Sequence, residues 1–227
     1  RRLHEGHPSM IILVTGAGGP AGRAVVRRFT GQGHTVIGVD RSGAEGCLPV
    51  DLLDADAVGR LAADVRAEHG RVDGIVHLVG GWRGSKTFAE TSLDDWAVLH
   101  DLLIRTLQHV TLAFEPLLKA SERGRFAIVS AKAAERPTQG NAAYGTAKAA
   151  SEAWTLAFAD ALEGTSSTAN ILVVKALVHE DMRAASPERT FPGFTDVDDL
   201  AAAVGDLWST DANGTRIDLT ATQGETA

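Results

Sequence analysis

Short apolar runs alternate with longer amphipathic stretches along the chain. The runs, bounded by glycines or polar turns, are typical of buried strands and fall at 10–15, 35–39, 46–50, 74–79, 125–129, 169–174 and 215–219. Helical spacing of apolar residues covers 21–30, 54–68, 93–119 (one long helix or two), 141–163 and 197–208, the last capped by Thr195 or Asp196. This alternation predicts an α/β fold, doubly wound, with a mostly parallel seven-stranded sheet and helices on both faces.

Length and composition fit one folded domain. The chain has 227 residues, of which 44% are hydrophobic and 22% charged, an ordinary balance for a globular protein. We expect a single domain over residues 10–227, preceded by a short tail over residues 1–9. The stretch 187–193 is expected to be a loop rather than a domain boundary.

Charge and residue content exclude several classes of function. The net charge of −7, without a basic patch, argues against a nucleic-acid-binding protein. Cys47 is the single cysteine, so no internal disulfide forms. No apolar run suits a membrane span or a signal peptide, and we expect a cytoplasmic protein without membrane contact. The histidines do not cluster at ligand spacing, so no metal site is predicted.

A glycine-rich turn follows the first strand. Residues 15–22 run Thr-Gly-Ala-Gly-Gly-Pro-Ala-Gly, and glycines at 16, 19 and 22 fit a tight turn from a strand into a helix. In a Rossmann-type fold such a turn lets the backbone approach a diphosphate, which the helix N-terminus binds with its free N–H groups. An ordinary glycine-rich loop has the same composition. The expected dinucleotide contacts are Gly16, Gly18, Gly19, Pro20 and Ala21.

An acid at the end of the second strand bears on the choice of cofactor. Asp40 stands where a carboxylate can accept hydrogen bonds from the adenosine ribose and would repel a 2′-phosphate, which favours NAD(H). The neighbouring Arg41 leaves NADP(H) open, because a guanidinium can bind the extra phosphate. Asp51 and Leu52 are expected to meet the adenine, and the alternative for Asp51 is a turn residue.

The only tyrosine of the chain, Tyr144, precedes Lys148 by four residues, so both lie on one face of a predicted helix. An ammonium group beside a phenol favours the phenolate and lowers the phenol pKa. A phenol tuned in this way can exchange a proton with a substrate during hydride transfer. A surface pair has the same spacing, and the position after the fifth strand favours the catalytic interpretation.

With these motifs, the chain from residue 10 onward resembles the short-chain dehydrogenase/reductase superfamily. The resemblance implies an oxidoreductase in which Tyr144 is the acid/base and Lys148 holds the nicotinamide ribose and lowers the Tyr144 pKa. It also implies a homodimer or homotetramer that acts on a small molecule. The motifs that carry the resemblance are the turn at 15–22, Asp40, Tyr144 with Lys148, and the cofactor-contacting pair Gly80 and Gly81 after the fourth strand.

Two positions depart from the superfamily pattern. The serine that usually assists the tyrosine falls at Ala131, and the usual helix asparagine falls at Leu103. Ser130 lies one residue away from the serine position, and neighbouring strand residues point to opposite faces. Ser130 is therefore a catalytic candidate only if the strand has ended or bulged before it.

A narrower resemblance, to dihydropteridine reductases, accounts for the missing serine. It rests on Ser-Ala-Lys-Ala-Ala at 130–134, Tyr-Gly-Thr-Ala-Lys at 144–148 and Gly-Gly-Trp at 80–82, whereas the loop at 175–181 differs. It implies substrate contacts from Trp82, Ala131 and Lys132, although Trp82 could equally be a partly buried rim aromatic.

Three functions follow from these features. The leading one is reduction of a flat conjugated acceptor, such as a quinonoid dihydropterin, a cyclic imine or an enone, by NAD(P)H. The first alternative is a biosynthetic ketoreductase or dehydrogenase that uses Ser130. The second is a catalytically weak nucleotide-sensing or scaffold protein.

Overall fold

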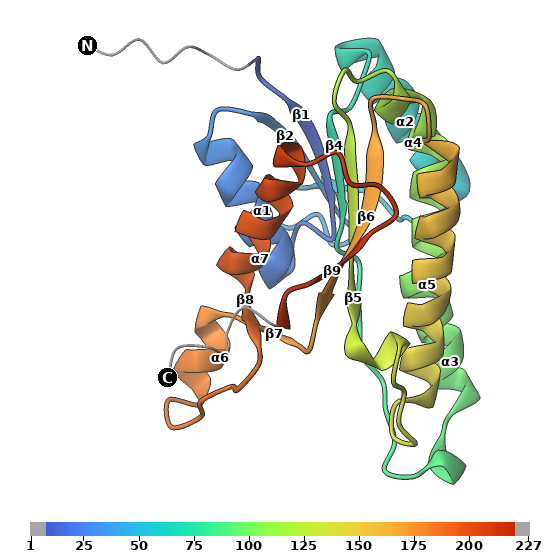
Figure 1. Cartoon of the computed structure of the whole chain (residues 1–227), viewed down its shortest axis with the longest axis vertical. Coiled ribbons are helices and arrows are strands. Elements are labelled where there is room, and N and C mark those ends of the chain that lie inside the picture. Colours follow the sequence, from blue (N-terminus) through green and yellow to red (C-terminus); the bar gives the residue numbers. More distant parts are fainter. Residues whose placement is uncertain (1–7, 221–227) are drawn as a thin grey trace.

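A parallel seven-stranded sheet occupies the middle of the molecule, with helices on both faces (Figure 1). The computed structural model describes residues 8–220, so most of the predicted tail lies outside the described residues. The strand order is β3-β2-β1-β4-β5-β6-β9, which confirms the predicted doubly wound sheet. The strands are β1 (Ile11–Thr15), β2 (Thr35–Asp40), β3 (Leu48–Pro49), β4 (Gly74–His77), β5 (Arg125–Ala131), β6 (Thr168–Val174) and β9 (Arg216–Asp218).

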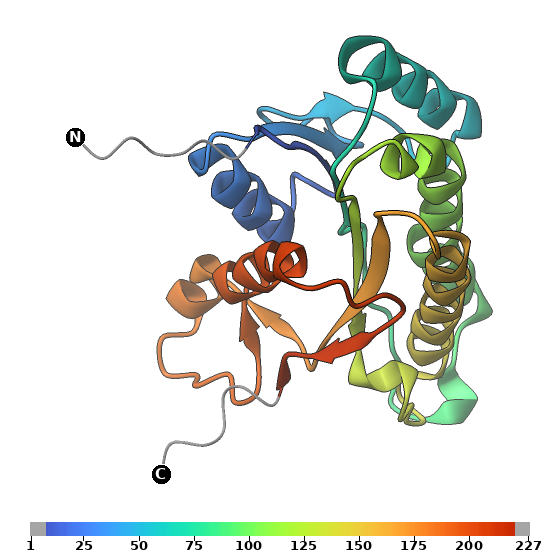
Figure 2. The same ribbon diagram turned by 45° about the horizontal axis from the view of Figure 1, so that its top comes forward.

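The helices divide between the two faces of the sheet. On one face lie α1 (Pro20–Gly31) and α7 (Val197–Asp206), which pack side by side (Figure 2). The other face carries α2 (Ala55–His69), α3 (Leu93–His100), α4 (Thr106–Lys119) and α5 (Ala142–Ala161). The remaining elements are α6 (Glu180–Ala185), the 3-10 turns η1 (Phe88–Glu90), η3 (Lys132–Ala134) and η4 (Leu207–Ser209), and a small parallel sheet of β7 (Leu177–Val178) and β8 (Thr195–Asp196).

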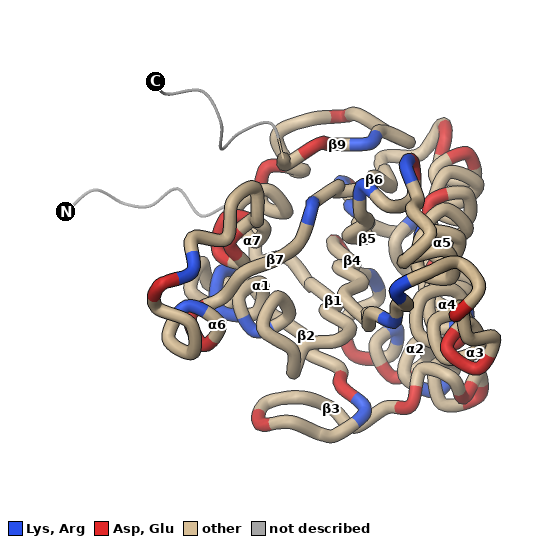
Figure 3. The backbone as a smooth tube through the Cα atoms, turned by 90° about the horizontal axis from the view of Figure 1, so that it is seen from below, with Lys and Arg blue, Asp and Glu red and all other residues tan. Residues whose placement is uncertain are grey.

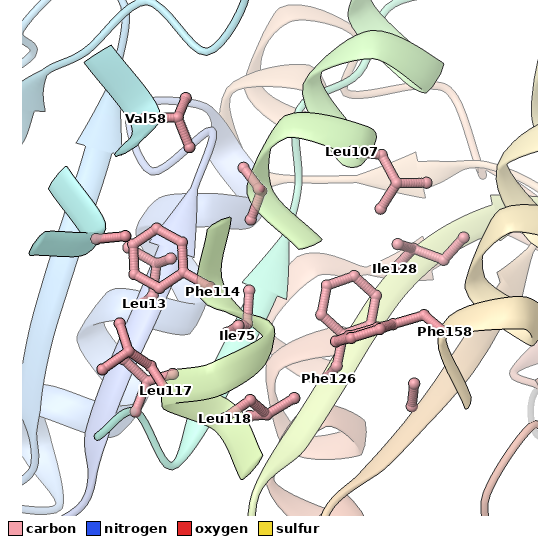
Figure 4. Close-up of a cluster of buried hydrophobic side chains, with 14 of the residues drawn as sticks. Leu13, Val58, Ile75, Leu107, Phe114, Leu117, Leu118, Phe126, Ile128 and Phe158 are labelled. Carbon is pink, nitrogen blue, oxygen red and sulfur yellow. The ribbon is translucent and has the colours of Figure 1, made fainter. Parts of the chain in front are cut away.

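Alternate residues of each central strand supply two hydrophobic cores. On β5, Phe126 and Ile128 belong to the core under α4 and α5, whereas Ala127 belongs to the core under α1 and α7. The rings of Phe126 and Phe158 meet edge to face, 5.1 Å apart, in the first of these cores (Figure 4). Because both faces of the sheet are covered, its strands are continuous apolar runs rather than alternating ones.

Three strands differ from the sequence prediction by two residues at one end, and the others by at most one residue at an end. The predicted strand at 46–50 shrinks to Leu48–Pro49, which are exposed at the sheet edge and pair on one side. The predicted strand at 74–79 ends at His77, which is aligned with the last residue of β1. The strand predicted at 125–129 continues to Ala131, because β6 pairs with it as far as Val174. These ends determine which side chains face the active site.

The stretch predicted as one long helix or two is a single continuous helical path. A π-helical turn, η2 (Asp101–Arg105), joins α3 directly to α4 and contains the buried Leu103. Of the two N-caps predicted for α7, the structure has Asp196. Its carboxylate accepts a hydrogen bond from the Asp198 N–H at 2.9 Å. Within residues 8–220, no helix combines the length and apolarity that a membrane span requires.

Candidate active site

A cavity of about 700 Å³ opens at the carboxyl ends of β4, β5 and β6. This is the edge of a parallel sheet at which ligands of doubly wound folds bind. Its wall is formed by the segments that follow these three strands and by the first turns of α5. Tyr144, Lys148, Gly80, Gly81 and Trp82 all line it. The structure thus brings the predicted catalytic pair and the predicted Gly-Gly-Trp segment to one place.

The glycine turn beside this cavity requires glycine at two positions. Gly16 has φ +65°, and a Cβ there would stand 2.6 Å from the Leu78 carbonyl oxygen. A Cβ on Gly22 would stand 2.2 Å from the Gly16 carbonyl oxygen, so the helix could not pack this closely. The turn leads into α1 with Gly19 at the N-cap and Pro20 at the first position.

The N-terminus of α1 suits an anionic group. No side chain caps this end, and its first turn carries no acidic residue. The first N–H groups of a helix have no intrahelical partner, and the helix dipole favours a negative charge there. Ala21, in this first turn, also lines the cavity. The backbone therefore fits the diphosphate of a dinucleotide.

Asp40 is held at the end of β2 by three hydrogen bonds. Its Oδ2 accepts from the Gly18 N–H at 3.1 Å, and its Oδ1 accepts from the Ser42 N–H and hydroxyl at 2.9 and 2.5 Å. These hydrogen bonds lower the pKa of Asp40. The Ser42 hydroxyl has the largest effect, and the Ser42 and Gly18 N–H groups add to it. The carboxylate is therefore ionised and held against the glycine turn, and the exposed Arg41 follows it.

The adenine contacts expected from Asp51 and Leu52 stay a prediction, and the structure shows what the two residues contact within the protein. The Asp51 Oδ1 accepts from the Leu53 N–H at 3.0 Å, which is the turn geometry considered as its alternative. The Leu52 side chain is buried in the core beneath α2 and α4, and its carbonyl bonds the His109 Nδ1 at 2.7 Å. With its side chain buried, Leu52 could meet a cofactor only through its backbone.

Tyr144 and Lys148 lie on α5 with the lysine Nζ 5.7 Å from the centre of the phenol ring. The Nζ donates a hydrogen bond of 2.9 Å to the Val129 carbonyl oxygen of β5. Among the described residues, none forms a hydrogen bond with the Tyr144 hydroxyl. The phenol is therefore a free proton donor on the cavity wall.

The two pKa shifts at this pair both originate in burial. Burial raises the pKa of Tyr144, and this corrects the expected lowering by Lys148. The physical reason is that removing the phenol from water disfavours its charged form, the phenolate. Burial also lowers the pKa of Lys148 to about 8, although the Glu152 carboxylate opposes this shift.

Ser130 does not meet the condition for a catalytic role. Its strand continues in register through Ala131, and its hydroxyl donates a 2.7 Å hydrogen bond to Glu152 of α5. The side chain is buried on the same face as Ile128. Ala131 occupies the serine position on the cavity wall and offers no donor there.

Behind the catalytic pair lies a charged network that the sequence analysis missed. Glu152 accepts hydrogen bonds from Ser130 and from the Arg216 Nε at 2.5 Å, and Arg216 also pairs with Glu135 at 3.3 Å. A signal was available in the sequence, because Glu152 follows Lys148 by four residues and shares its helix face. The partners on β5 and β9 could not be found in that way.

The remaining predicted residues line the cavity or its rim. Trp82 is 62% exposed on the cavity wall. Lys132 lines the cavity and forms an ion pair with Asp218 of β9.

His77 is a buried core histidine bonded to Thr15 and Thr106, and burial lowers its pKa to about 3. In the described part of the chain, no three His, Cys, Asp or Glu side chains converge on a position for a metal.

Known proteins resemble the chain in sequence and in fold. Residues 10–189 match the family described as short chain dehydrogenase. The NADP-dependent 3-hydroxy acid dehydrogenase YdfG of Escherichia coli is 27% identical over 168 residues, which cover 69% of this chain and 68% of that protein.

Many solved structures share the fold, and two of them, each with a TM-score of 0.81, illustrate it. The aldohexose dehydrogenase of Thermoplasma acidophilum is 18% identical over 96% of both chains. The NADPH-bound short chain oxidoreductase of Pseudomonas aeruginosa, described as containing an atypical catalytic center, is 20% identical over 96% of this chain and 98% of that one. With the glycine turn, Asp40, Tyr144 and Lys148 in place, the chain belongs to the short-chain dehydrogenase family and is a nicotinamide-dependent oxidoreductase.

Proposed function

We propose that the protein reduces a flat, conjugated cyclic acceptor, with Tyr144 as the proton donor. The observation that carries this proposal is the pairing of a free Tyr144 hydroxyl with Ala131 on the same cavity wall. The Tyr144 hydroxyl is therefore the one neutral hydrogen-bond donor for the substrate atom that gains charge, whereas the superfamily pattern provides both a tyrosine and a serine. A quinonoid dihydropterin, a cyclic imine or an enone spreads the developing charge over its ring and needs less stabilisation than a plain ketone.

The chain's own residues move the proton and orient the two reactants. When bound, the nicotinamide supplies the hydride, and the Tyr144 hydroxyl donates its proton to the nitrogen or oxygen that gains the electron pair. Lys148, fixed on the Val129 carbonyl, keeps a positive charge beside the phenol and is placed to bond a ribose hydroxyl. The exposed indole of Trp82 provides a surface on which a flat ring can stack.

Asp40 supports a preference for NADH. Its ionised carboxylate lies at the end of β2, where it would accept from both ribose hydroxyls and repel a 2′-phosphate. The relative in Escherichia coli is named NADP-dependent, so the adjacent Arg41 could still support NADPH. A fluorescence titration with each cofactor decides between them, and tighter NADPH binding would overturn the preference.

The reaction is tested with quinonoid dihydropterin and isatin as conjugated acceptors and cyclohexanone as the unconjugated control. We expect the protein with NADH to reduce the conjugated acceptors at least about tenfold faster than cyclohexanone. Tyr144→Phe should lose about 10²-fold or more in kcat while the NADH dissociation constant stays unchanged. Near-normal activity of Tyr144→Phe would exclude the mechanism. Cofactor binding without turnover of any acceptor would instead favour nucleotide sensing.

A second candidate is a dehydrogenase of hydroxy acids or a ketoreductase. It is favoured by the name of the relatives, 3-hydroxy acid dehydrogenase, and by their similarity over 168 residues. The engagement of Ser130 by Glu152 weighs against the version of this activity that uses Ser130. NAD(P)⁺-dependent oxidation of 3-hydroxybutyrate, faster than any reduction of isatin, would establish this candidate.

We also propose that the protein works as a homodimer or homotetramer through the outer faces of α4 and α5. Leu112 on α4 is 65% exposed and Leu156 on α5 is 43% exposed, and water-exposed leucines on a helix pair are typical of a covered face. Light scattering of the purified chain measures the oligomeric state. A monomer at micromolar concentration would exclude this assembly.

A further inference from the structure

The cavity differs in charge from the chain as a whole. The protein carries a net charge of −7, yet four cationic side chains and no carboxylate line the cavity. Lys and Arg segments lie beside β5 and β6 when the sheet is viewed toward its carboxyl ends (Figure 3). The four are Lys132, Arg136, Lys148 and Lys175.

Two of these cations already have a role or a counter-charge. Lys132 pairs with Asp218, so its charge is neutralised within the protein. Lys148 is engaged by the Val129 carbonyl beneath the phenol. Lys175 donates to the Pro192 carbonyl at 3.2 Å, which satisfies one N–H without neutralising the charge. Arg136 forms no ion pair within residues 8–220, although its guanidinium carries five donors.

A second donor lines the same cavity as Arg136. Asn141, at the N-cap of α5, uses its Oδ1 to accept from the Thr138 N–H at 2.7 Å. That bond orients the amide, so its NH₂ group is the part left for the cavity. Arg136 and Asn141 both belong to the segment that joins β5 to α5, next to Tyr144. The polar side chains of this segment that line the cavity, those of Lys132, Arg136 and Asn141, all carry N–H donors, and none is a carboxylate.

We propose that Arg136, assisted by the Asn141 amide and the Lys175 charge, binds an anionic group of the substrate, a carboxylate or an oxyanion of similar shape. A planar guanidinium holds such a group through two parallel hydrogen bonds, which fixes both position and orientation. The substrate would then be a conjugated ring with an acidic substituent, held by Arg136 at one end and by Tyr144 at the reacting end. This inference rests on the proposed function only for the end of the substrate that reacts at Tyr144.

The test compares isatin with isatin-5-sulfonate, two flat acceptors that differ by one negative charge. Wild type, Arg136→Gln and Arg60→Gln are assayed with NADH. Arg60 is an exposed arginine of α2 outside the cavity and serves as the matched control. We expect Arg136→Gln to lower kcat/KM for the sulfonate at least about tenfold through KM, with isatin changed less than about twofold. Arg60→Gln should change neither.

Equilibrium dialysis of both compounds against the NAD⁺-loaded protein gives dissociation constants that need no turnover. Tighter wild-type binding of the sulfonate, lost in Arg136→Gln, supports the anion site even if neither compound is reduced, a result that would count against the proposed reaction only. Equal binding of the two compounds to wild type overturns the anion site. So does an equal loss for both in Arg136→Gln, which marks a structural role. A higher NADH dissociation constant in Arg136→Gln also overturns the anion site, because the Arg136 guanidinium then binds the cofactor phosphates.

Discussion

The Ser130 hydroxyl donates a 2.7 Å hydrogen bond to the Glu152 carboxylate, on the face of β5 that packs against α5. Glu152 in turn binds Arg216 of β9, so one carboxylate connects the strand, the helix and the sheet edge. The neighbouring residue Ala131 faces the cavity in place of a donor. Both residues line the cavity, but the one hydroxyl of this pair, that of Ser130, already donates its proton to Glu152.

We expect Ser130→Ala to reduce stability and leave catalysis intact. The variant removes one donor from a buried carboxylate that keeps Arg216, so unfolding should become easier by about 1–2 kcal/mol. Urea denaturation measures this change, and turnover of isatin should stay within about twofold of wild type. A loss of more than about tenfold in kcat would place the Ser130 hydroxyl in the reaction.

Ala131→Ser is the complementary change on the cavity wall. Ala131 is 5% exposed, and a hydroxyl there would supply the second donor that plain ketones need. We expect kcat/KM for cyclohexanone to rise about tenfold while that for isatin changes little. If cyclohexanone reduction does not improve, a single donor is not what restricts the enzyme to conjugated acceptors.

The rate should depend on the charge of Lys148. Its pKa is lowered to about 8 by burial, so the ammonium group loses its proton as the pH rises through that value. We expect kcat/KM to fall on the alkaline side with an apparent pKa near 8. Lys148→Arg should move this limb beyond pH 10, because a guanidinium stays charged. Glu152→Gln should move it to lower pH, because the carboxylate opposes the lowering. An unchanged limb in both variants would assign it to another group.

Asp40→Ala should weaken the discrimination between the two cofactors. The carboxylate is ionised and held by Gly18 and Ser42, so its removal takes away a ribose acceptor and a repulsive charge together. We expect NADH to bind about tenfold more weakly and NADPH to bind as well as before or better. Parallel fluorescence titrations measure both constants. Equal weakening of both cofactors would mean that Asp40 only supports the loop.

His77 should make the protein sensitive to acid. Its folded pKa of about 3 lies below the unfolded value near 6.5, so the unfolded chain binds the extra proton between these values. Stability therefore falls as the pH drops below about 6.5, by ~1.4 kcal/mol per unit and about 3 kcal/mol by pH 4.5. Urea midpoints at several pH values measure the slope. His77→Asn should flatten it, and an unchanged slope would point to other groups.

Much of the fold and site could be predicted from local sequence. The parallel sheet followed from apolar runs alternating with helical stretches, because each covered strand must be apolar on both faces. Gly16 could be recognised from the glycine spacing at 16, 19 and 22, and its positive φ and closeness to Leu78 explain why no side chain fits there. The placement of Tyr144 and Lys148 on one wall followed from their spacing on a helix.

Features that depend on tertiary contacts could not be predicted in this way. The fate of Ser130 depended on β6, which extends β5 to Ala131 by pairing with it. The direction of the Tyr144 pKa shift depended on how deeply the fold buries the phenol, which the sequence does not show. The cationic group around Arg136 combines the segment after β5 with Lys175 after β6, so no single stretch of sequence contains it.

The contact between Gly18 and Asp40 also constrains how this protein can evolve. A Cβ at position 18 would stand 2.6 Å from the Asp40 Oδ2, so any larger residue there displaces the acid. Conversely, an acid lost from position 40 removes the acceptor of the Gly18 N–H. The two positions are therefore epistatic, and a lineage that changes its cofactor must alter the turn and the strand end together or pass through a poorly binding intermediate.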